Sequence, residues 1–334
     1  MNKESRVYYG LDFLRLDDLP NTFLISLEPS FRRSFFELLI AEKGYKLLSK
    51  ELGISVSFLY HLKNGRHAIR LKHLQILCSL YSIPINNLEK HISEIISNRG
   101  GRINFSFPIV PTNELASLLG HCFGDSSIDN KKMEFNYVNK DLSLVLSVIS
   151  DVSKQFSPKT HNLYKQKDCT YKVSFSNLVG KILFLFGAPK GNKIDCKNPI
   201  PSWIMSGVPE IKLAFLKSLF DDDGSVLFSK KYPAINVNLH LTKLSIHEMD
   251  LRSFLQQVQV LLSDFSITSN GPYIARRYCV DGKERTVLGI FISDFENIKK
   301  FDQIVGFSHK EKKSRLKKCL LNRKRVFKSK EKKY

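Results

Sequence analysis

Two stretches of the chain, 98 positions apart, carry one pattern: LASLLGHCFGDSSI at Leu115–Ile128 and LAFLKSLFDDDGSV at Leu213–Val226. The match is positional, because leucine, alanine, aspartate and serine recur at the same places in both copies. Apolar residues fall at helical spacing in each copy, which predicts two amphipathic helices. The repeat therefore predicts a pseudo-twofold molecule whose two helices both end on acidic residues.

Small residues form a second stripe on each predicted helix. They recur at four-residue intervals, at Ala116, Gly120 and Gly124 in the first copy and at Ala214 and Ser218 in the second. Such a stripe allows two helix backbones to approach closely. The sequence therefore predicts that the two helices pack against each other.

The last aspartates of the two copies, Asp125 and Asp223, suggest a metal site. A carboxylate at a helix C-terminus opposes the macrodipole at a cost of about 0.3–1 kcal/mol, and two carboxylates brought together also repel each other. A hard cation removes both penalties, and Mg²⁺ favours one or two carboxylates completed by phosphate oxygens and water. We therefore expect these aspartates to bind Mg²⁺ (or Mn²⁺) beside an anionic substrate. An ordinary helix end before a turn is the alternative for either copy alone.

The segments Leu118–Ser126 and Leu216–Gly224 resemble the two motifs of single-chain LAGLIDADG homing endonucleases of archaeal type. The resemblance covers residues 112–321 and implies an α+β fold, in which two pseudosymmetric αββαββα repeats form a DNA-binding saddle. The segments between the motifs are compatible with that fold. The expected strands are Lys131–Val138, Tyr171–Phe175, Ala234–Leu241 and Thr286–Ile292, and the expected helices are Asp141–Phe156 and Leu244–Leu262.

This resemblance implies a site-specific endonuclease that hydrolyses both strands of DNA, with Asp125 and Asp223 as catalytic metal ligands. Two similar turns, Gly187–Lys193 and Gly306–Lys312, resemble the family's turn that carries a basic residue near each active centre. Lys193 and Lys312 are therefore expected to be catalytic, because a lysine can stabilise charge on a transferring phosphoryl group. A neighbouring lysine, or no catalytic role for these loops, remains the alternative.

The first motif departs from the family pattern at one position. Ser126 stands where the second copy has Gly224. If that position needs a left-handed backbone, serine costs about 1–2 kcal/mol there. The first centre would then be impaired, which would leave a nicking enzyme or a DNA-binding relic. Because Asp125 is present, two competent metal-binding carboxylates remain the expectation.

A separate DNA-binding domain is expected before Thr112. Residues 46–63 read as a helix, a turn at Gly53, an N-cap at Ser55 and a second helix, which is the layout of a helix-turn-helix. The segment is similar to repressor-type domains, which place the second helix in the major groove. An all-α domain is expected, with further helices at Pro29–Glu42, Leu71–Tyr81 and from Pro84 to Ser97. A purely structural three-helix bundle is the alternative.

The chain is therefore divided into a helix-turn-helix domain (1–98), a linker (99–111), two LAGLIDADG repeats (112–206 and 207–321) and a basic tail (322–334). Residues 99–102 are expected to act as a hinge. Helix and strand positions provide the candidate DNA contacts. They are Ser55, Ser57, Tyr60, His61, Lys63 and Arg66 in the helix-turn-helix, and Asn136, Lys172, Asn236, Asn238, Arg276 and Arg277 in the repeats.

The charge of the chain favours a polyanionic partner. Fifty-two Lys and Arg against 32 Asp and Glu give a net charge of +20, so binding to phosphates with counterion release is expected. The six cysteines contain no Cys-x-x-Cys pair, which argues against a zinc site. No apolar stretch approaches the ~20 residues that a membrane-spanning helix needs. The residues expected at intein splice junctions are also missing from the two ends of the sequence.

These observations predict a monomer that binds a long asymmetric site on double-stranded DNA, in the cytoplasm with the nucleoid of a prokaryotic host. Two alternatives remain open. One is a non-catalytic helix-turn-helix regulator that carries a degenerate LAGLIDADG module. The other is a splicing maturase that binds intron RNA, although the deep, narrow major groove of A-form RNA excludes a recognition helix.

Overall fold

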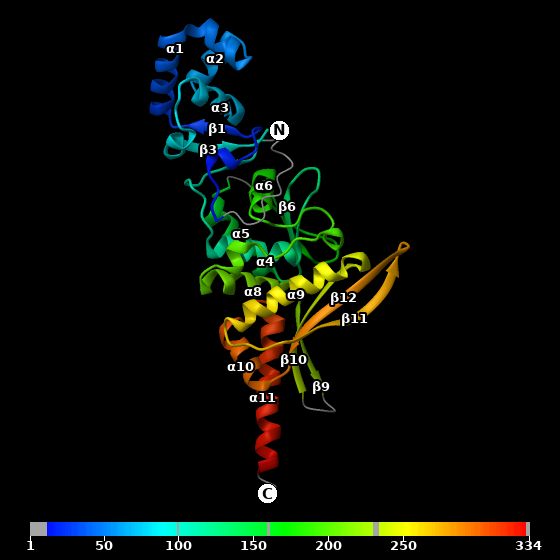
Figure 1. Cartoon of the computed structure of the whole chain (residues 1–334). Coiled ribbons are helices and arrows are strands. Elements are labelled where there is room, and N and C mark those ends of the chain that lie inside the picture. The colour runs from blue at the N-terminus through cyan, green and yellow to red at the C-terminus, as the bar shows by residue number, and fades with distance from the viewer. Residues whose placement is uncertain (1–11, 99, 159–160, 230–233, 332–334) are drawn as a thin grey trace.

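The computed structural model describes residues 12–98, 100–158, 161–229 and 234–331, and side chains in the last helix are described to Leu321. Figure 1 shows the N-terminal region at the top, the first repeat below it and the second repeat below that, with the C-terminal helix projecting from the bottom. The basic tail expected at 322–334 is helical to Glu331, and its last three residues lie outside the described part.

Both repeats have the αββαββα order. The first consists of α4 (Asn113–Phe123), β5 (Ser126–Ile128), β6 (Phe135–Asn139), α5 (Leu142–Phe156), β7 (Asn162–Lys165), β8 (Tyr171–Phe175) and α6 (Asn177–Leu185). The second consists of α8 (Pro209–Asp223), β9 (Gly224–Ser229), β10 (Ala234–Leu244), α9 (Glu248–Ser263), β11 (Asn270–Val280), β12 (Lys283–Ile292) and α10 (Phe295–Ile304). Short 3-10 and α-helical turns, η4 (Lys193–Asp195) and α7 (Ser202–Met205), connect the repeats, η5 (Ser245–His247) precedes α9, and α11 (Lys310–Glu331) ends the chain.

The two four-stranded antiparallel sheets have the same topology. Their strand orders are β5-β6-β8-β7 and β9-β10-β12-β11. The α+β fold with two pseudosymmetric repeats is therefore confirmed. The repeats differ in size, because the β11–β12 hairpin of the second repeat is much longer than the β7–β8 hairpin and extends away from the body of the molecule (Figure 1).

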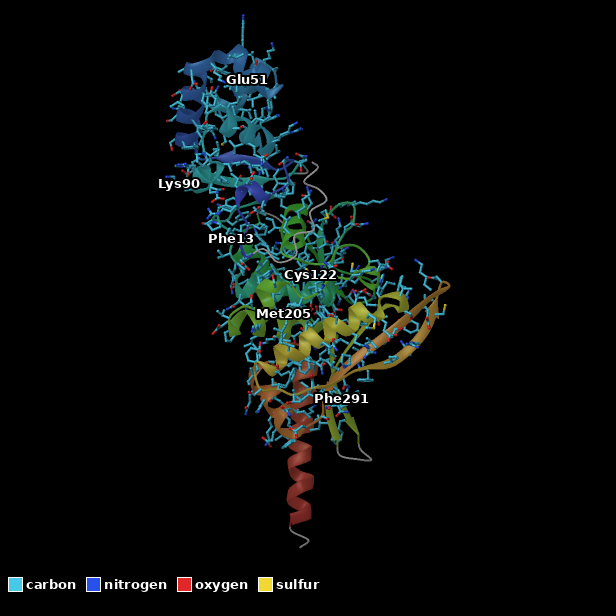
Figure 2. The ribbon with its side chains drawn as sticks, in the orientation of Figure 1. Phe13, Glu51, Lys90, Cys122, Met205 and Phe291 are labelled. Carbon is cyan, nitrogen blue, oxygen red and sulfur yellow. The ribbon has the colours of Figure 1, made fainter. Side chains whose placement is uncertain are left out.

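The motif helices α4 and α8 pack directly against each other, as the stripe of small residues predicted. A Cβ atom added at Gly120 would lie 2.5 Å from the carbonyl oxygen of Phe215 and 2.8 Å from Cβ of Ser218. One turn away, the Oγ atoms of Ser117 and Ser218 are hydrogen-bonded at 2.8 Å. Figure 2 shows Cys122 of α4 in the middle of the molecule, where it is 1% exposed. Only small residues permit this close contact between the helices.

The N-terminal region contains two helices joined by a turn at the positions expected from the sequence. Helix α1 (Pro29–Leu52), which includes a non-helical residue at Gly44, ends at Gly53 in the left-handed conformation. Helix α2 (Val56–Lys63) begins after Ser55, whose side chain accepts a hydrogen bond from Phe58 N at 3.1 Å. Leu48, Leu52 and Leu59 are buried in its core. Helix α3 (Leu71–Leu80) follows.

The expectation of an all-α N-terminal domain is wrong. Strands β2 (Ile69–Arg70), β1 (Leu24–Leu27), β3 (Ile92–Ile96) and β4 (Arg102–Ile103) form an antiparallel sheet in that order. The helix expected from Pro84 to Ser97 is replaced by a 3-10 segment, η3 (Ile85–His91), and by β3. The apolar residues of Ile92–Ile96 are compatible with either a helix or a strand. Pairing with β1, which lies far away in the sequence, makes the segment a strand.

Several boundaries in the repeats also differ from the sequence expectation. The strand expected from Lys131 begins only at Phe135, because the side chain of Asp129 accepts hydrogen bonds from the backbone N–H groups of Lys131 and Lys132 and holds a turn. The helix expected from Leu244 begins at Glu248, because β10 continues to Leu244 in register with β12.

The segment expected to be a hinge is packed onto the first repeat; residue 99 lies outside the described part. A Cβ atom added at Gly101 would lie 2.5 Å from Cβ of Ser176. Asn104 N donates a hydrogen bond to the carbonyl oxygen of Phe156 at 3.0 Å. These contacts seat the N-terminal domain against repeat 1. No helix in the described part of the chain is long and apolar enough to cross a membrane.

Candidate active site

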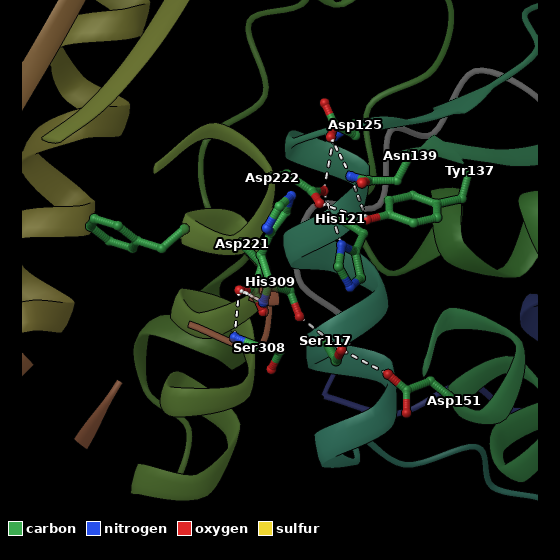
Figure 3. Close-up of polar contacts among 12 residues, drawn as sticks. Ser117, His121, Asp125, Tyr137, Asn139, Asp151, Asp221, Asp222, Ser308 and His309 are labelled. Carbon is green, nitrogen blue, oxygen red and sulfur yellow. Dashed lines mark hydrogen bonds and ion pairs between the residues drawn. The ribbon is translucent and has the colours of Figure 1, made fainter. Parts of the chain in front are cut away.

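The candidate site lies where α4 and α8 end side by side (Figure 3). Asp125 follows the last residues of α4 and directly precedes β5. Its Oδ2 atom accepts a hydrogen bond from Asn139 Nδ2 at 2.9 Å, so β6 orients the carboxylate. The residue retains contact with solvent, but partial burial and then the Asp222 carboxylate raise its pKa above the usual value. The Asp125 carboxylate is therefore oriented by the Asn139 amide.

Asp222 connects the two repeats through a buried hydrogen-bond network. Its Oδ2 atom is 2.9 Å from His121 Nδ1 and accepts a hydrogen bond from Asp125 N, also at 2.9 Å, while Oδ1 accepts one from the Tyr137 hydroxyl at 2.8 Å. The Asp222 side chain is fully buried. Three neighbours thus satisfy this carboxylate, and its position is structural.

Asp221 has a different partner. Its Oδ1 atom accepts hydrogen bonds from the backbone N–H groups of Ser308, at 2.7 Å, and His309, at 2.9 Å. These groups belong to the turn that precedes α11. Asp221 is 3% exposed, and burial raises its pKa. The residue fixes the second basic turn against the end of α8.

Asp223 is the carboxylate of the three that remains for a ligand. Burial, followed by the carboxylates of Asp125 and Asp222, raises its pKa to about 8. The positive charges of Lys193 and Lys312 act in the opposite direction and lower the pKa values of both Asp125 and Asp223. The crowding of negative charge at this point is the condition that a bound cation relieves.

The two expected catalytic lysines are held differently. Lys312 Nζ donates hydrogen bonds to the carbonyl oxygens of Asp221, at 2.6 Å, and Asp222, at 2.8 Å, at the C-terminal end of α8. Burial lowers the pKa of Lys312, and the neighbouring carboxylates oppose that shift. The backbone of Lys193 begins the short helix η4, and its carbonyl oxygen accepts a hydrogen bond from Lys243.

The left-handed backbone that would strain Ser126 in the first centre is not found. Ser126 is the first residue of β5 and is not among the described residues with positive φ. Its counterpart Gly224 has φ −73° and ψ 154°, which any residue adopts. Glycine is needed at position 224 for space, because an added Cβ would lie 2.4 Å from the carbonyl oxygen of Phe220. At the equivalent position of the first motif, the side chain of Ser126 is buried.

Some of the candidate DNA contacts in the N-terminal region are exposed, and others already contact neighbouring side chains or backbone groups. Ser57, Tyr60 and Arg66 are exposed, and Tyr60 retains 50% of its surface. Lys63 Nζ lies 3.3 Å from Glu37 Oε1 in an ion pair with α1. His61, which is half-buried, lies edge-to-face against His67. The Ser55 side chain is used as the helix cap.

The strand candidates of the first repeat form one surface with the N-terminal domain. Asn136 and Lys172 line a polar hollow of about 500 Å³, together with Ser97 and Gly101 from the N-terminal region. Asn136 Oδ1 accepts a hydrogen bond from Ser174 Oγ at 2.6 Å. The N-terminal domain therefore borders the sheet face on which the first repeat carries its candidate DNA contacts.

The candidate DNA contacts on the strands of the second repeat differ in exposure and in their partners. Asn238 is 2% exposed between β9 and β12, so the structure contradicts its expected role as a base reader. Asn236, two residues earlier on the same strand, is half-buried. On the hairpin, Arg276 lies over the Tyr278 ring at 4.5 Å, and Arg277 is exposed but paired with Glu248 at 2.7 Å.

Two residues of the site, His121 and Tyr137, were missed at the sequence level, and a third, Asn139, was a candidate for DNA contact and not for this site. The helical spacing places His121 on the buried side of α4, and the alternation of β6 places Tyr137 and Asn139 on one face. A polar residue at a core position is the signal that could have indicated them. Their common partners on α8 and at Asp125 could not be read from the spacing.

Among the described residues no group of three or more His, Cys, Asp and Glu side chains is arranged to hold a metal. The donor set at the ends of the motif helices is a pair, Asp125 and Asp223. Both carboxylates have raised pKa values, and neither is paired with a cation in a hydrogen-bonded salt bridge. A pair of this kind fits Mg²⁺ or Mn²⁺, whose remaining ligands can be water and phosphate.

One known family model matches a part of the chain that lies within the second repeat. Residues 210–306 match the family model described as a LAGLIDADG-like domain. This match begins in α8 and ends after α10, so it contains Asp223 and the whole sheet of repeat 2.

Known proteins with similar sequences are longer. A "tRNA-splicing ligase RtcB" of Methanopyrus kandleri is 34% identical over 136 residues, which cover 41% of this chain and 13% of that protein. A "Replication factor C small subunit" of Methanocaldococcus jannaschii is 26% identical over 167 residues, which cover 46% of this chain and 9% of that protein. The similarity thus concerns a small part of each relative.

Solved structures with distant similarity include the homing endonuclease I-DmoI, in a study of its mesophilic variants. It is 16% identical, with a TM-score of 0.37, and the alignment covers 58% of this chain and 95% of that chain. Full-length DUF199/WhiA from Thermatoga maritima is 14% identical, with a TM-score of 0.38, and the alignment covers 64% of this chain and 63% of that chain. At these values neither structure decides the function.

Proposed function

We propose that the chain is a site-specific endonuclease that hydrolyses both strands of DNA with divalent metal ions. The observation that carries the proposal is that the three consecutive aspartates at the end of α8 have different partners. Asp221 and Asp222 accept hydrogen bonds from protein donors, whereas the charges of Asp125, Asp222 and two lysines act on the buried Asp223. A carboxylate pair kept at such an electrostatic cost is typical of a functional site.

Each group has a distinct chemical role in this proposal. Asp125 and Asp223 would hold Mg²⁺ or Mn²⁺, which supplies neutralisation of the phosphate charge and a lower pKa for the attacking water. Lys193 and Lys312 add positive charge beside the scissile phosphate. Asn139 keeps the Asp125 carboxylate oriented, and the Asp222 network keeps the ends of the two motif helices together.

DNA recognition is assigned to the two sheets and to the N-terminal domain. Exposed residues of α2, the polar hollow over repeat 1 and the long β11–β12 hairpin provide different surfaces along the molecule. Because these surfaces are unequal, we infer a long asymmetric target. Asn238 is left out of this interface, and the other candidates stay in it. A monomer with the two repeats in one chain needs no partner subunit to complete the site.

The similar proteins support a module whose activity is separate from theirs. Their names describe unrelated activities, a tRNA-splicing ligase, a replication factor C subunit and a glutamine–fructose-6-phosphate aminotransferase. The matched segment forms between 9% and 23% of each. Because similar segments occur in proteins with such different activities, we infer that the segment has an activity of its own. Action on DNA, with the nucleoid as its location in the cell, fits such a segment.

The test is cleavage of a supercoiled plasmid library that carries genomic fragments, in Mg²⁺ or in EDTA, with recovery of the cut sequences. Wild type should give Mg²⁺-dependent linear product at one site. Asp125→Asn and Asp223→Asn should lose cleavage by about 100-fold or more while retaining binding to the recovered site. Asp264→Asn, in an exposed ion pair with Lys212, is the matched control and should cut normally.

Other outcomes would favour the other functions. Tight binding of a recovered DNA site without strand scission in any divalent metal would point to a regulator. Preference for a folded intron RNA over the same sequence as duplex DNA would point to a maturase. Cleavage that survives both substitutions would contradict the proposed carboxylate pair.

A further inference from the structure

Lys243 lies at the end of β10 in the second repeat, but its side chain binds a turn of the first. Its Nζ atom donates hydrogen bonds to the carbonyl oxygens of Lys193, at 2.5 Å, and Cys196, at 2.6 Å. These carbonyls bracket η4, the short helix that begins with the candidate catalytic Lys193. Burial lowers the pKa of Lys243, so a cation is kept here at a cost in solvation.

The same turn is attached on its other side to the first repeat. Gly191 N donates a hydrogen bond to the carbonyl oxygen of Ile128 at 2.8 Å, at the end of the strand that follows Asp125. Between the turn and β10 there remains a small cavity of about 50 Å³, lined among others by Lys193, Cys196 and Lys243. The turn is therefore clamped between β5 of one repeat and β10 of the other.

We propose that Lys243 is a positioning residue, which holds the Lys193 turn at the candidate active centre from the opposite repeat. The inference rests on the proposed function, because it gives the turn a catalytic lysine to position. Lys312 needs no such residue, since its own ammonium is bound to the end of α8. The two basic turns are therefore held in different ways. Lys243 binds the first turn, and the Lys312 ammonium binds the second turn to the end of α8.

Two interactions make Lys243 suited to this task. A charged donor forms stronger hydrogen bonds to carbonyl oxygens than a neutral one, and one ammonium satisfies both carbonyls at the two ends of η4. Methionine at this position has a similar length and lacks the donors. The carbonyl of Cys196 then loses this donor, and the carbonyl of Lys193 keeps only the backbone hydrogen bond from Cys196 N at 3.2 Å, so the turn can open toward solvent.

The first experiment needs no DNA. Cys196 lies in the turn and is half-buried, while Cys169 and Cys279 are exposed and are replaced by serine in all variants. In this background, Lys243→Met should raise the rate of maleimide labelling at Cys196 by about tenfold, because labelling follows local opening of the turn. Lys243→Arg should restore much of the protection. Lys197→Met, which removes an exposed lysine one residue after Cys196, is the matched control and should label like the parent protein.

An unchanged labelling rate in Lys243→Met would overturn the proposal. Circular dichroism and the urea midpoint check that each variant is folded. If Lys243→Met fails to fold, the comparison of Lys243→Arg with Lys243→Gln decides the question, because glutamine keeps a neutral donor on a shorter chain. Labelling that is equal in these two variants would also overturn it.

The second experiment measures single-turnover cleavage of the recovered site at saturating protein. Lys243→Met should lower the cleavage rate by about 10- to 100-fold with little change in DNA affinity, as expected for a displaced catalytic group. On a Lys193→Met background the same substitution should have almost no further effect. An equal loss on both backgrounds would show that Lys243 acts by another route.

Labelling tests whether Lys243 holds the turn, and cleavage tests whether Lys193 on that turn is catalytic. Increased labelling together with full cleavage in Lys193→Met would mean that Lys243 holds the turn but that Lys193 is not catalytic. In that case the proposed role of Lys193 fails, and with it the catalytic meaning of Lys243. Absence of cleavage in wild type would contradict the proposed function and leave the labelling result intact.

Discussion

The two copies of the motif place their last aspartates at equivalent positions but in unlike surroundings. Asp125 is exposed and oriented by Asn139, whereas Asp223 is crowded by other carboxylates, with its pKa raised to about 8. Asp222, next to Asp223, carries the network that joins the copies, and its equivalent in the first copy is Gly124. Duplication has kept the position of the carboxylate and not its electrostatic environment.

Packing at the pseudo-twofold axis explains why the copies cannot be identical. Equivalent positions of α4 and α8 meet there: Gly120 packs on Ser218, and Gly124 packs on Asp222. A Cβ atom added at Gly124 would lie 2.5 Å from Cβ of Asp222. Where equivalent residues touch, one copy can have a larger side chain only if the other has a small one. The difference between the copies is thus a consequence of their contact.

The largest effect on stability is expected for Asp222→Ala. It leaves His121 and Tyr137 buried without their partner, and removing one member of such a buried network costs about 3–5 kcal/mol. The free energy of unfolding in urea measures this loss. Asp223→Asn is the control on the adjacent residue and should not destabilise the fold, because it replaces a carboxylate whose charged form is disfavoured by burial. Similar losses in both variants would contradict the division of roles between Asp222 and Asp223.

A second comparison concerns the residues that follow the two aspartates. Gly224→Ala places a Cβ 2.4 Å from the carbonyl oxygen of Phe220, so the strand must move. We expect a loss of about 1–3 kcal/mol in the free energy of unfolding. Ser126→Gly at the equivalent position should cost less than about 1 kcal/mol, because it removes one small side chain and creates no steric clash. An equal cost for the two substitutions would show that the two positions have the same packing.

The contact at the axis can be tested with Gly124→Ala. The added methyl group meets Asp222, and overpacking at such a contact costs about 1–2 kcal/mol. On an Asp222→Gly background the same substitution should cost clearly less, since the side chain that it meets is gone. Urea unfolding of the four proteins in this cycle measures the coupling. Additive losses would mean that the two residues do not compete for the same space.

The smallest effect is expected on the long hairpin that distinguishes the second repeat. Glu248 is 2.7 Å from Arg277 and also contacts Arg252, so it holds two cations on the face of the hairpin. Glu248→Gln should leave the urea midpoint unchanged, because the Arg277 side of the pair is exposed. Affinity for duplex DNA should rise by about twofold, since Arg277 is released and net positive charge increases. Titrations by fluorescence anisotropy at two salt concentrations measure the change. A fall in affinity would assign Glu248 a direct role in presenting Arg277.

Local rules were enough for the elements with strong patterns. The spacing of the repeats predicted α4, α8 and their packing, and Gly53 and Ser55 predicted the turn between α1 and α2. The alternation in Tyr171–Phe175 predicted β8 with its observed bounds. These features depend on residues within a few positions of one another, where side-chain period, capping and backbone preference act directly.

The remaining features depended on partners far apart in the chain. Ile92–Ile96 became a strand because β1 pairs with it, and Asn238 was buried because β9 and β12 flank it. A single run of three aspartates received three different roles only after Ser308, His121 and Asp125 were brought to it from other elements.

The sequence by itself determined that there are two copies, that their helices pack together and that an aspartate ends each one. Those facts follow from periodicity, small residues and a fixed offset, which the order of residues contains. The tertiary structure alone decided which aspartates are satisfied, that Lys243 of one repeat holds the Lys193 turn of the other, and that the N-terminal region contains a sheet. Hydrogen bonds and charges act over a few ångströms in space, so their partners are defined only when the chain has folded.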